Sequence, residues 1–281
     1  MISAEEHLRQ GDPAQALQAL QEQVRSRPGD ARLRVFLFQL LCVLGQWQRA
    51  LTQLETAAGL DPAALLMKQM YGDAVRCEML RAEIFAGRKA PLVLGQPETW
   101  LALLIESLLR TGQGDVAQAR VLRARAFEEA PEVAGTLDGQ TFSWIADADM
   151  RLGPVLEAII NGRYYWLPFA RLRQLRIEAP SDLRDAVWLP AQLEFDNGGE
   201  SLVLIPTRYA GSQTSSDGLI ALARKTVWDE PEEGFFCGQG QRLLSTDTGD
   251  FALMDVRLIS FAASASDPSP VSPESSAQAG G

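Results

Sequence analysis

The 281-residue chain is 46% hydrophobic and 22% charged, a composition typical of a soluble globular protein with room for one sizeable domain or two smaller ones. Its formal net charge of −10 has the wrong sign for a protein that follows a phosphate backbone, so nucleic acid is not an expected partner. The three cysteines are far apart and odd in number, which predicts free thiols in a reducing compartment rather than disulfides or a CxxC metal site.

The amino terminus and the longest apolar run argue against export and membrane insertion. The start, MISAEEHLRQGD, is acidic and lacks the basic and apolar regions of a secretory signal. The run VFLFQLLCVLG, from Val35, is about half as long as a membrane span needs, so we expect a buried helix there. A cytoplasmic protein with no membrane partner is predicted.

The first half contains an internal repeat. GDPAQALQALQEQVRSRP aligns without a gap with GQWQRALTQLETAAGLDP at a spacing of 34 residues, which is the tetratricopeptide (TPR) period. Small side chains at Ala16 and Ala50 permit close helix packing. A third copy is GDVAQARVLRARAFEEAP, and residues 63–91 before it are predicted to form a degenerate helical pair. Residues 1–134 are therefore predicted to be a TPR-like helical-repeat domain.

Stacked repeats leave a concave face lined by the first helix of each pair, and such a groove is suited to an amphipathic helix of a partner. We predict that six side chains from two of these helices face the groove: Arg32, Phe36, Gln39, Leu101, Ile105 and Leu108. An apolar stripe at helical spacing is more often part of a core, and that alternative stays open from the sequence.

The periodicity changes after Pro131. Gly153-Pro154 is predicted to open a short helix, which Gly162 ends as a left-handed cap. The following RYYWLPF predicts a strand that is covered on both faces. The aromatic cluster thus marks a change of architecture, and ligand stacking by its rings is the less favoured alternative.

A hairpin is expected further on, because AVWLPAQLEF and ESLVLIPTRY flank the turn signal DNGG. Pro190 and Pro206 indicate edge strands or limited pairing. Residues 135–262 are predicted to form a small strand-rich α+β domain, and the Ser/Pro-rich residues 263–281 a disordered tail. The predicted fold class is α+β.

Few residues could support catalysis. His7 is the only histidine, which excludes His-based triads and multi-histidine metal sites. Asp147, Asp149 and Glu157 could share a cation or a proton, but Arg151 stands where a calcium loop needs another oxygen ligand.

These acids are instead expected to pair with arginines of the same region, Arg151, Arg163, Arg184 and Arg208, in a polar network at an interface. The possible second interface comprises Asp147, Asp149, Arg151, Arg163, Tyr165, Trp166 and Arg208. No enzyme activity, no cofactor and no metal site are predicted.

Five segments carry a family resemblance: FAGRKAPLVLGQPETW, FSWIADADMRLGPVLEAIINGRYYWLPF, IEAPSDLRDAVW, LIPTRYAGS and GQGQRLL. Together they resemble the ImpE/TagJ family, accessory proteins of the bacterial type VI secretion system. The resemblance implies a cytoplasmic, non-enzymatic adaptor that binds the N-terminal helix of the small contractile-sheath subunit, TssB. It also implies a direct or indirect link to the AAA+ ATPase ClpV, which recycles contracted sheaths. The alternative is a small-molecule-binding or hydrolytic α+β domain, using Asp147, Asp149 and Trp166, fused to a generic TPR scaffold.

Overall fold

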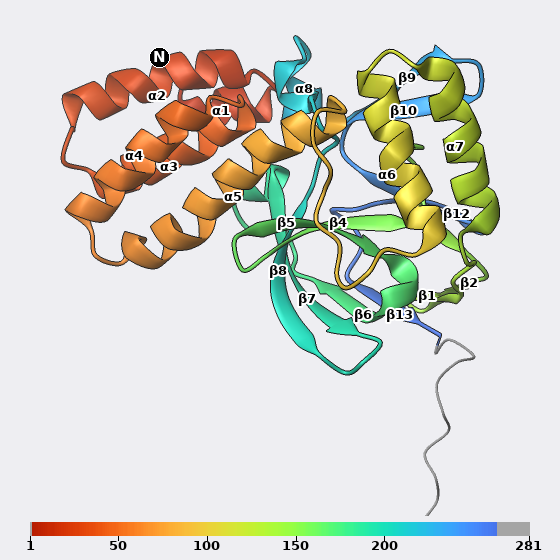
Figure 1. The fold of residues 1–281 in the computed structure, drawn as a ribbon. Helices are drawn as coiled ribbons and strands as arrows, with labels where there is room; N and C mark the ends of the chain where they lie inside the picture. Colours follow the sequence, from red (N-terminus) through yellow and green to blue (C-terminus); the bar gives the residue numbers. More distant parts are fainter. Residues whose placement is uncertain (1, 263–281) are drawn as a thin grey trace, which may run out of the picture.

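Residues 2–262 are described in the computed structural model, and the predicted tail, residues 263–281, lies outside them. Helices make up the first half of the chain and strands most of the second, which confirms the α+β class. The first seven helices are α1 (Ala4–Arg9), α2 (Pro13–Ser26), α3 (Ala31–Val43), α4 (Trp47–Leu60), α5 (Ala64–Phe85), α6 (Thr99–Gly112) and α7 (Val116–Glu129). Figure 1 shows α1–α4 stacked at one end, with α5 running from them toward the strands and the α6–α7 pair beyond it.

The repeat pattern corresponds to helix–turn–helix pairs. Gly11 and Gly45 have φ of 80° and 64°, a left-handed conformation that glycine adopts without steric cost, and each ends a helix at the same place in the repeat. Asp12 caps the next helix by accepting a bond from the N–H of Gln15. The predicted close contact at Ala16 and Ala50 is confirmed, since both are fully buried.

The prediction of a degenerate helical pair at residues 63–91 is wrong. A single helix, α5, runs unbroken over 22 residues and a loop follows it. Gly72-Asp73 repeats the turn signal found at Gly11-Asp12, but Tyr71 and Val75 beside it are buried against the core. Continuous packing along α5 therefore overrides the local signal.

Within residues 2–262 the strands form three antiparallel sheets. The large sheet has eight strands in the order β2-β1-β13-β6-β7-β8-β4-β5, and the smaller sheets are β12-β11-β3 and β10-β9. Their bounds are β1 (Gly135–Leu137), β2 (Gln140–Phe142), β3 (Ile145–Asp147), β4 (Val155–Ile160), β5 (Arg163–Pro168), β6 (Leu172–Ile177), β7 (Trp188–Phe195), β8 (Glu200–Pro206), β9 (Thr226–Glu232), β10 (Phe235–Gly240), β11 (Leu243–Thr246), β12 (Gly249–Ala252) and β13 (Leu258–Phe261). Short helices connect them: η1 (Phe169–Arg171), η2 (Leu183–Ala186), η3 (Ser212–Thr214) and α8 (Gly218–Ala221).

The helix predicted after Gly153-Pro154 is a strand, β4. Asn161 (φ 49°) and Gly162 (φ 73°) form a two-residue turn between β4 and β5, so Gly162 ends a strand instead of capping a helix. All six residues of β4 are buried, and a strand covered on both faces has no alternation to distinguish it from a helix. The strand predicted at RYYWLPF is confirmed as β5.

The predicted hairpin is confirmed as β7–β8, but its strands are central, and the edge prediction is wrong. The pairing of β7 with β6 ends at Ala191, and Pro190, the residue before it in the chain, lies just outside that pairing. Its carbonyl still accepts a bond from the N–H of Glu178 at 3.0 Å. Pro206 is the last residue of β8. Both prolines thus occupy positions where a missing N–H interrupts little of the ladder.

Two hydrophobic cores lie on the two faces of the large sheet. The first core packs the helices against one face and includes Leu20, Leu41, Val75, Leu104, Trp166 and Trp188. The second core lies between the other face and the three-stranded sheet and includes Leu156, Leu175, Leu193, Ile259 and Leu244. The first core draws side chains from both sides of residue 134, so the repeats and the strands share one packed interior. Among the described helices, none has the length and apolar character that crossing a membrane requires.

Candidate functional site

The predicted concave groove is filled by the chain's own strand-rich part. Trp188 of β7 lies against the ring of Trp47 at 6.3 Å between centroids and that of Tyr71 at 5.9 Å. Arg208, after β8, donates to the carbonyl oxygens of Cys42 and Val43 at the end of α3, at 2.9 and 2.7 Å. Both carbonyls lie in the last turn of α3, where a helix leaves its carbonyl oxygens without i+4 partners; that of Cys42 also accepts from the N–H of Gly45, and Arg208 supplies the further donors.

The predicted groove residues consequently divide into two groups. Gln39, Leu101 and Leu108 are 8%, 2% and 5% exposed, and Ile105 packs partly buried against the first core. The prediction that these side chains lie open on a concave face is wrong, because the strands cover it. Arg32 is exposed, and Phe36, one helical turn later, is half-buried.

Phe36 lines a cleft of about 380 Å³ where the helices meet the strand-rich part. We call it the Phe36 cleft. Its apolar side chains come from α1, α3, η2 and three loops: Leu8, Phe36, Pro180, Leu183, Leu222 and Met254. Charged side chains of both signs also line it: Glu5, Arg9, Asp182 and Arg224. An apolar floor with charges of both signs around it suits the two faces of an amphipathic helix.

Local hydrogen bonds hold the walls of the Phe36 cleft. Asp182 and Asp185 form a capping box at η2, in which Asp185 accepts bonds from the N–H groups of Ser181 and Asp182 at 2.6 and 2.8 Å. Arg224 donates to the carbonyl of Leu8 at 2.6 Å and thereby ties the loop after α8 to α1. The cleft is thus formed before any partner arrives.

Of the predicted second interface, Arg163 and Tyr165 of β5 reach the surface. Both line a cleft of about 660 Å³, the Tyr165 pocket, beside Leu94, Arg171 and Phe195. The other members are buried, except for Arg151, which is half-buried with its guanidinium turned inward.

The buried members belong to an ionic network around β4. Glu157 accepts bonds from Arg81 of α5 at 2.5 and 2.8 Å, and Nη1 of Arg242 lies 3.2 Å from its Oε2. Arg242 also donates through Nε to Asp147 at 2.8 Å; its Nη2 is 2.7 Å from the same oxygen without a hydrogen-bonding angle, so that contact is ionic only.

The predicted pairing of acids with arginines is correct for Asp149 and Arg151 (Nε to Oδ1, 2.9 Å) and wrong for the other three arginines. Arg163 is exposed, Arg184 pairs with Asp182, and Arg208 binds carbonyl oxygens. The sequence missed Arg81 and Arg242. Their acids are 76 and 85–95 positions away along the chain, and no local pattern marks such a pair.

The network changes the acidity of its members. Burial alone would raise the pKa of Glu157, but Arg81 and Arg242 outweigh it and hold that pKa below its ordinary value. Burial raises the pKa of Asp147 to about 6 against the opposing effect of Arg242. Burial lowers the pKa of Arg208 to about 10, because carbonyl oxygens and not a carboxylate face its guanidinium.

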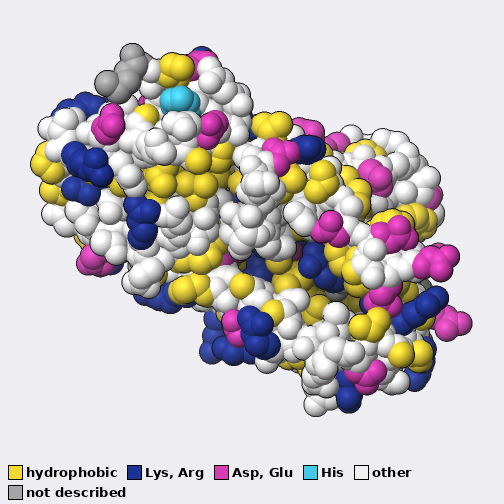
Figure 2. All heavy atoms as spheres, turned by 90° about the horizontal axis from the view of Figure 1, so that it is seen from above, with side chains coloured by type: hydrophobic (Ala, Val, Ile, Leu, Met, Phe, Trp, Pro, Cys, Tyr) yellow, Lys and Arg dark blue, Asp and Glu magenta, His cyan; other side chains and the backbone are white. Residues whose placement is uncertain are grey.

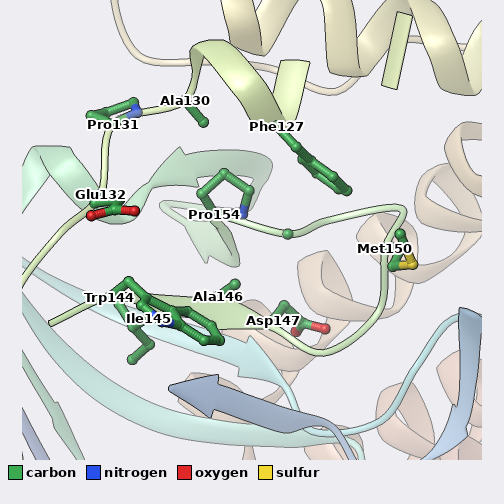
Figure 3. A pocket seen from close by; sticks show the side chains of 11 residues that line it. Phe127, Ala130, Pro131, Glu132, Trp144, Ile145, Ala146, Asp147, Met150 and Pro154 are labelled. Atoms are coloured by element: carbon green, nitrogen blue, oxygen red, sulfur yellow. The ribbon is translucent and has the colours of Figure 1, made fainter. Parts of the chain in front are cut away.

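A pocket of about 320 Å³ lies beside this network, between the end of α7 and β3 (Figure 3). Phe127, Pro131, Trp144 and Pro154 give it apolar walls, and Trp144 is 37% exposed. Asp147 lies at one end, with its carboxylate bound by Arg242. Trp166 is fully buried and donates to Tyr164 at 2.8 Å, far from solvent.

This arrangement gives the hydrolase or ligand-sensor alternative little support. Asp147 and Asp149 are each bound by an arginine, and Trp166 offers no open face for stacking. In the part of the chain that the structure describes, no group of three His, Cys, Asp or Glu side chains is arranged to hold a metal ion.

The Phe36 cleft combines residues that the sequence did not connect. Leu8, Leu183 and Leu222 come from three segments with no shared motif, so only the tertiary fold brings them together. Figure 2, seen from above, shows apolar side chains gathered over the end formed by α1–α4 and again toward the middle of the molecule, with charged side chains of both signs scattered around them.

Comparisons with known proteins cover both halves of the chain. The ImpE protein family matches residues 139–260, and the tetratricopeptide repeat family matches residues 7–70. Over 258 residues the chain is 52% identical to the type VI secretion system accessory component TagJ of Pseudomonas aeruginosa, which covers 92% of this chain and 90% of that protein. It is also similar to the crystal structure of protein VPA1032 from Vibrio parahaemolyticus, with a TM-score of 0.85 and 26% identity, covering 92% of this chain and 97% of that one.

Proposed function

The chain belongs to the ImpE family of type VI secretion system accessory proteins, and we propose that it acts there as a non-enzymatic adaptor for the sheath. The proposed ligand is the N-terminal helix of the small sheath subunit, TssB. The adaptor would thereby assist the disassembly of contracted sheaths by ClpV, through direct or indirect contact, in the cytoplasm.

The Phe36 cleft is the observation that carries this proposal. A helix laid in it would place its apolar side chains on Phe36, Leu183 and Leu222, and its polar face toward Arg9 and Asp182. The walls are held by the capping box of η2 and by the bond from Arg224, so little ordering free energy is lost on binding. A role without turnover agrees with the buried carboxylates, which are committed to arginines.

The test is a titration of a labelled peptide with the sequence of the TssB N-terminal helix against wild-type protein and variants. Phe36→Ala removes an aromatic anchor, and we expect a loss of about 2 kcal/mol, or roughly thirtyfold weaker binding. Arg32→Ala should weaken binding less, and the effect should shrink at high salt because Arg32 is exposed. Arg25→Ala, an exposed arginine on α2, is the matched control and should bind like the wild type.

A Tyr165→Ala variant separates the two clefts. Each variant is first checked for folding by its thermal midpoint, since Phe36 also packs against the first core. A folded Phe36→Ala protein that binds like the wild type, together with a Tyr165→Ala protein that no longer binds, would assign the helix to the Tyr165 pocket. If both variants bind the peptide like the wild type, neither cleft is the helix site.

A further inference from the structure

A small cavity of about 160 Å³ lies between the α6–α7 pair, the end of α5 and the β9–β10 hairpin, apart from the Phe36 cleft. Leu104 and Leu108 of α6, Phe85 of α5 and Phe235 of β10 give it apolar walls. Its volume exceeds the share of a single water several times over, so it has room for a small organic molecule.

The cavity contains an arginine whose hydrogen-bonding capacity is unfilled. Arg123 of α7 is 5% exposed, and its guanidinium carbon lies 3.4 Å from the centre of the Phe235 ring. Its nearest carboxylate oxygen, on Glu232, is 3.7 Å from Nη2, which is a long ion pair and not a hydrogen bond. No other described residue bonds to the Arg123 guanidinium. Burial lowers the pKa of Arg123, and the nearby carboxylate of Glu232, which acts to raise it, does not offset the loss of hydration.

Two further donors line the same cavity. Ser107 is 3% exposed and lines the cavity, and no described residue accepts a hydrogen bond from its hydroxyl, so that hydroxyl is free to bond to a molecule in the cavity. Arg151 uses Nε and Nη2 on Asp149 and on the carbonyl of Gly238, which leaves Nη1 without a hydrogen bond inside the described chain. Donors without acceptors, in a cavity with apolar walls, favour a ligand that brings an acceptor.

We propose that this cavity binds a small organic monocarboxylate. Its carboxylate would accept bonds from Arg123, Ser107 and Arg151, because a guanidinium fork matches the two oxygens of a carboxylate. A short apolar tail would contact Leu104 and Leu108. Asp149 already pairs closely with Arg151, so only Arg123, with Glu232 at 3.7 Å, presents a positive charge without a close counter-ion among the described residues of the cavity, which favours a monoanion over a dianion such as phosphate.

Cys237 provides a direct readout of occupancy. It lines the cavity and is half-buried, whereas Cys42 and Cys77 are buried. Burial raises its pKa to about 11, so alkylation by iodoacetamide is slow and is best followed at alkaline pH. Mass spectrometry of the peptide carrying Cys237 gives the rate with and without butyrate, phenylacetate or inorganic phosphate, at constant ionic strength. Thermal midpoints are measured in the same solutions.

Butyrate or phenylacetate should slow the alkylation severalfold and raise the midpoint, while phosphate should do neither. Arg123→Gln and Ser107→Ala should each abolish most of this protection, with affinity about tenfold lower or worse for the arginine variant. Arg125→Gln, an exposed arginine on the same helix paired with Glu129, is the control and should keep it. Equal protection in the Arg123→Gln or Ser107→Ala protein, equal protection by phosphate, or no protection by either carboxylate would each overturn the proposal.

Discussion

The buried ionic network should contribute measurably to stability through Arg81, which joins α5 to the large sheet. Arg81 is 2% exposed and donates to Glu157 twice and to the carbonyl oxygen of Arg208 at 3.0 Å. Arg81→Met keeps much of the apolar stem but removes the charge. Glu157, which is fully buried, would then keep only Arg242 and Tyr164 as partners.

The expected loss follows from leaving a buried charge partly unpaired. Removing one partner of a buried ion pair costs about 3–5 kcal/mol, and Arg242, which remains 3.2 Å from Glu157, places this case near the lower end, at about 3 kcal/mol. Replacing Glu157 as well, in Arg81→Met/Glu157→Gln, removes the unpaired charge on β4. The double variant should therefore lose less than the sum of the two single losses, by about 1–3 kcal/mol.

Urea denaturation followed by tryptophan fluorescence and far-UV circular dichroism measures these losses without adding salt. Trp166 and Trp188 are buried next to the network: Trp188 donates to Glu78, which lies 3.4 Å from Arg81, and Trp166 donates to Tyr164, a partner of Glu157. Fluorescence and circular dichroism should therefore report one transition. Arg88→Met is the control, because Arg88 also makes a two-bond pair, with Glu83 at 2.8 Å for both bonds, but at the surface. We expect no change in its midpoint. A midpoint for Arg81→Met equal to that of the Arg88 variant would refute the role given to the network.

Two further predictions follow from single positions. Burial raises the pKa of Asp147 from its ordinary 3.8 to about 6, so the native state holds this proton more tightly than the unfolded state does. The free energy of unfolding should therefore fall as pH rises from about 4 to about 6, by up to about 3 kcal/mol. Urea midpoints of wild type and Asp147→Asn between about pH 4 and pH 7 test this: the wild type should lose stability relative to the variant, and the opposite slope contradicts the assignment. Gly162→Val should destabilise the protein more than Gly198→Val. Both glycines have a left-handed backbone, which costs a residue with a side chain about 1–2 kcal/mol. Only at Gly162 would the added Cβ also lie 2.8 Å from the carboxylate of Asp73. Equal losses of thermal stability would show that Asp73 simply moves aside.

The sequence predicted those parts of the fold that short-range patterns encode. The repeat at Ala16 and Ala50 was readable because each helix pair uses the same glycine turn and the same small contact residue. The β7–β8 hairpin was readable from its turn. Strand β4 was not, because a segment buried on both faces shows neither a helical nor an alternating pattern.

The candidate site was less predictable than the fold, since exposure depends on what covers a helix face. Arg32 and Leu101 have the same register in their repeats, yet Arg32 is exposed and Leu101 is buried. Arg81 and Glu157 form the closest buried ion pair of the network, although nothing in their local sequences connects them. Pairs of this kind arise from chain topology and not from spacing.

The filled groove changes where a partner helix is expected to bind. In a free TPR array the concave face accepts a peptide, but in this chain Trp188 and Arg208 occupy that position and complete the first core. Displacing them would expose apolar surface and remove the bonds from Arg208 to the carbonyl oxygens of Cys42 and Val43, so a partner gains more by binding at the margin of the filled groove. The Phe36 cleft is that margin, and it contains residues of α1, α3 and η2. The proposed recognition would therefore require the repeats and the strand-rich part together, and substitutions in either half should weaken binding by moving the walls of the cleft.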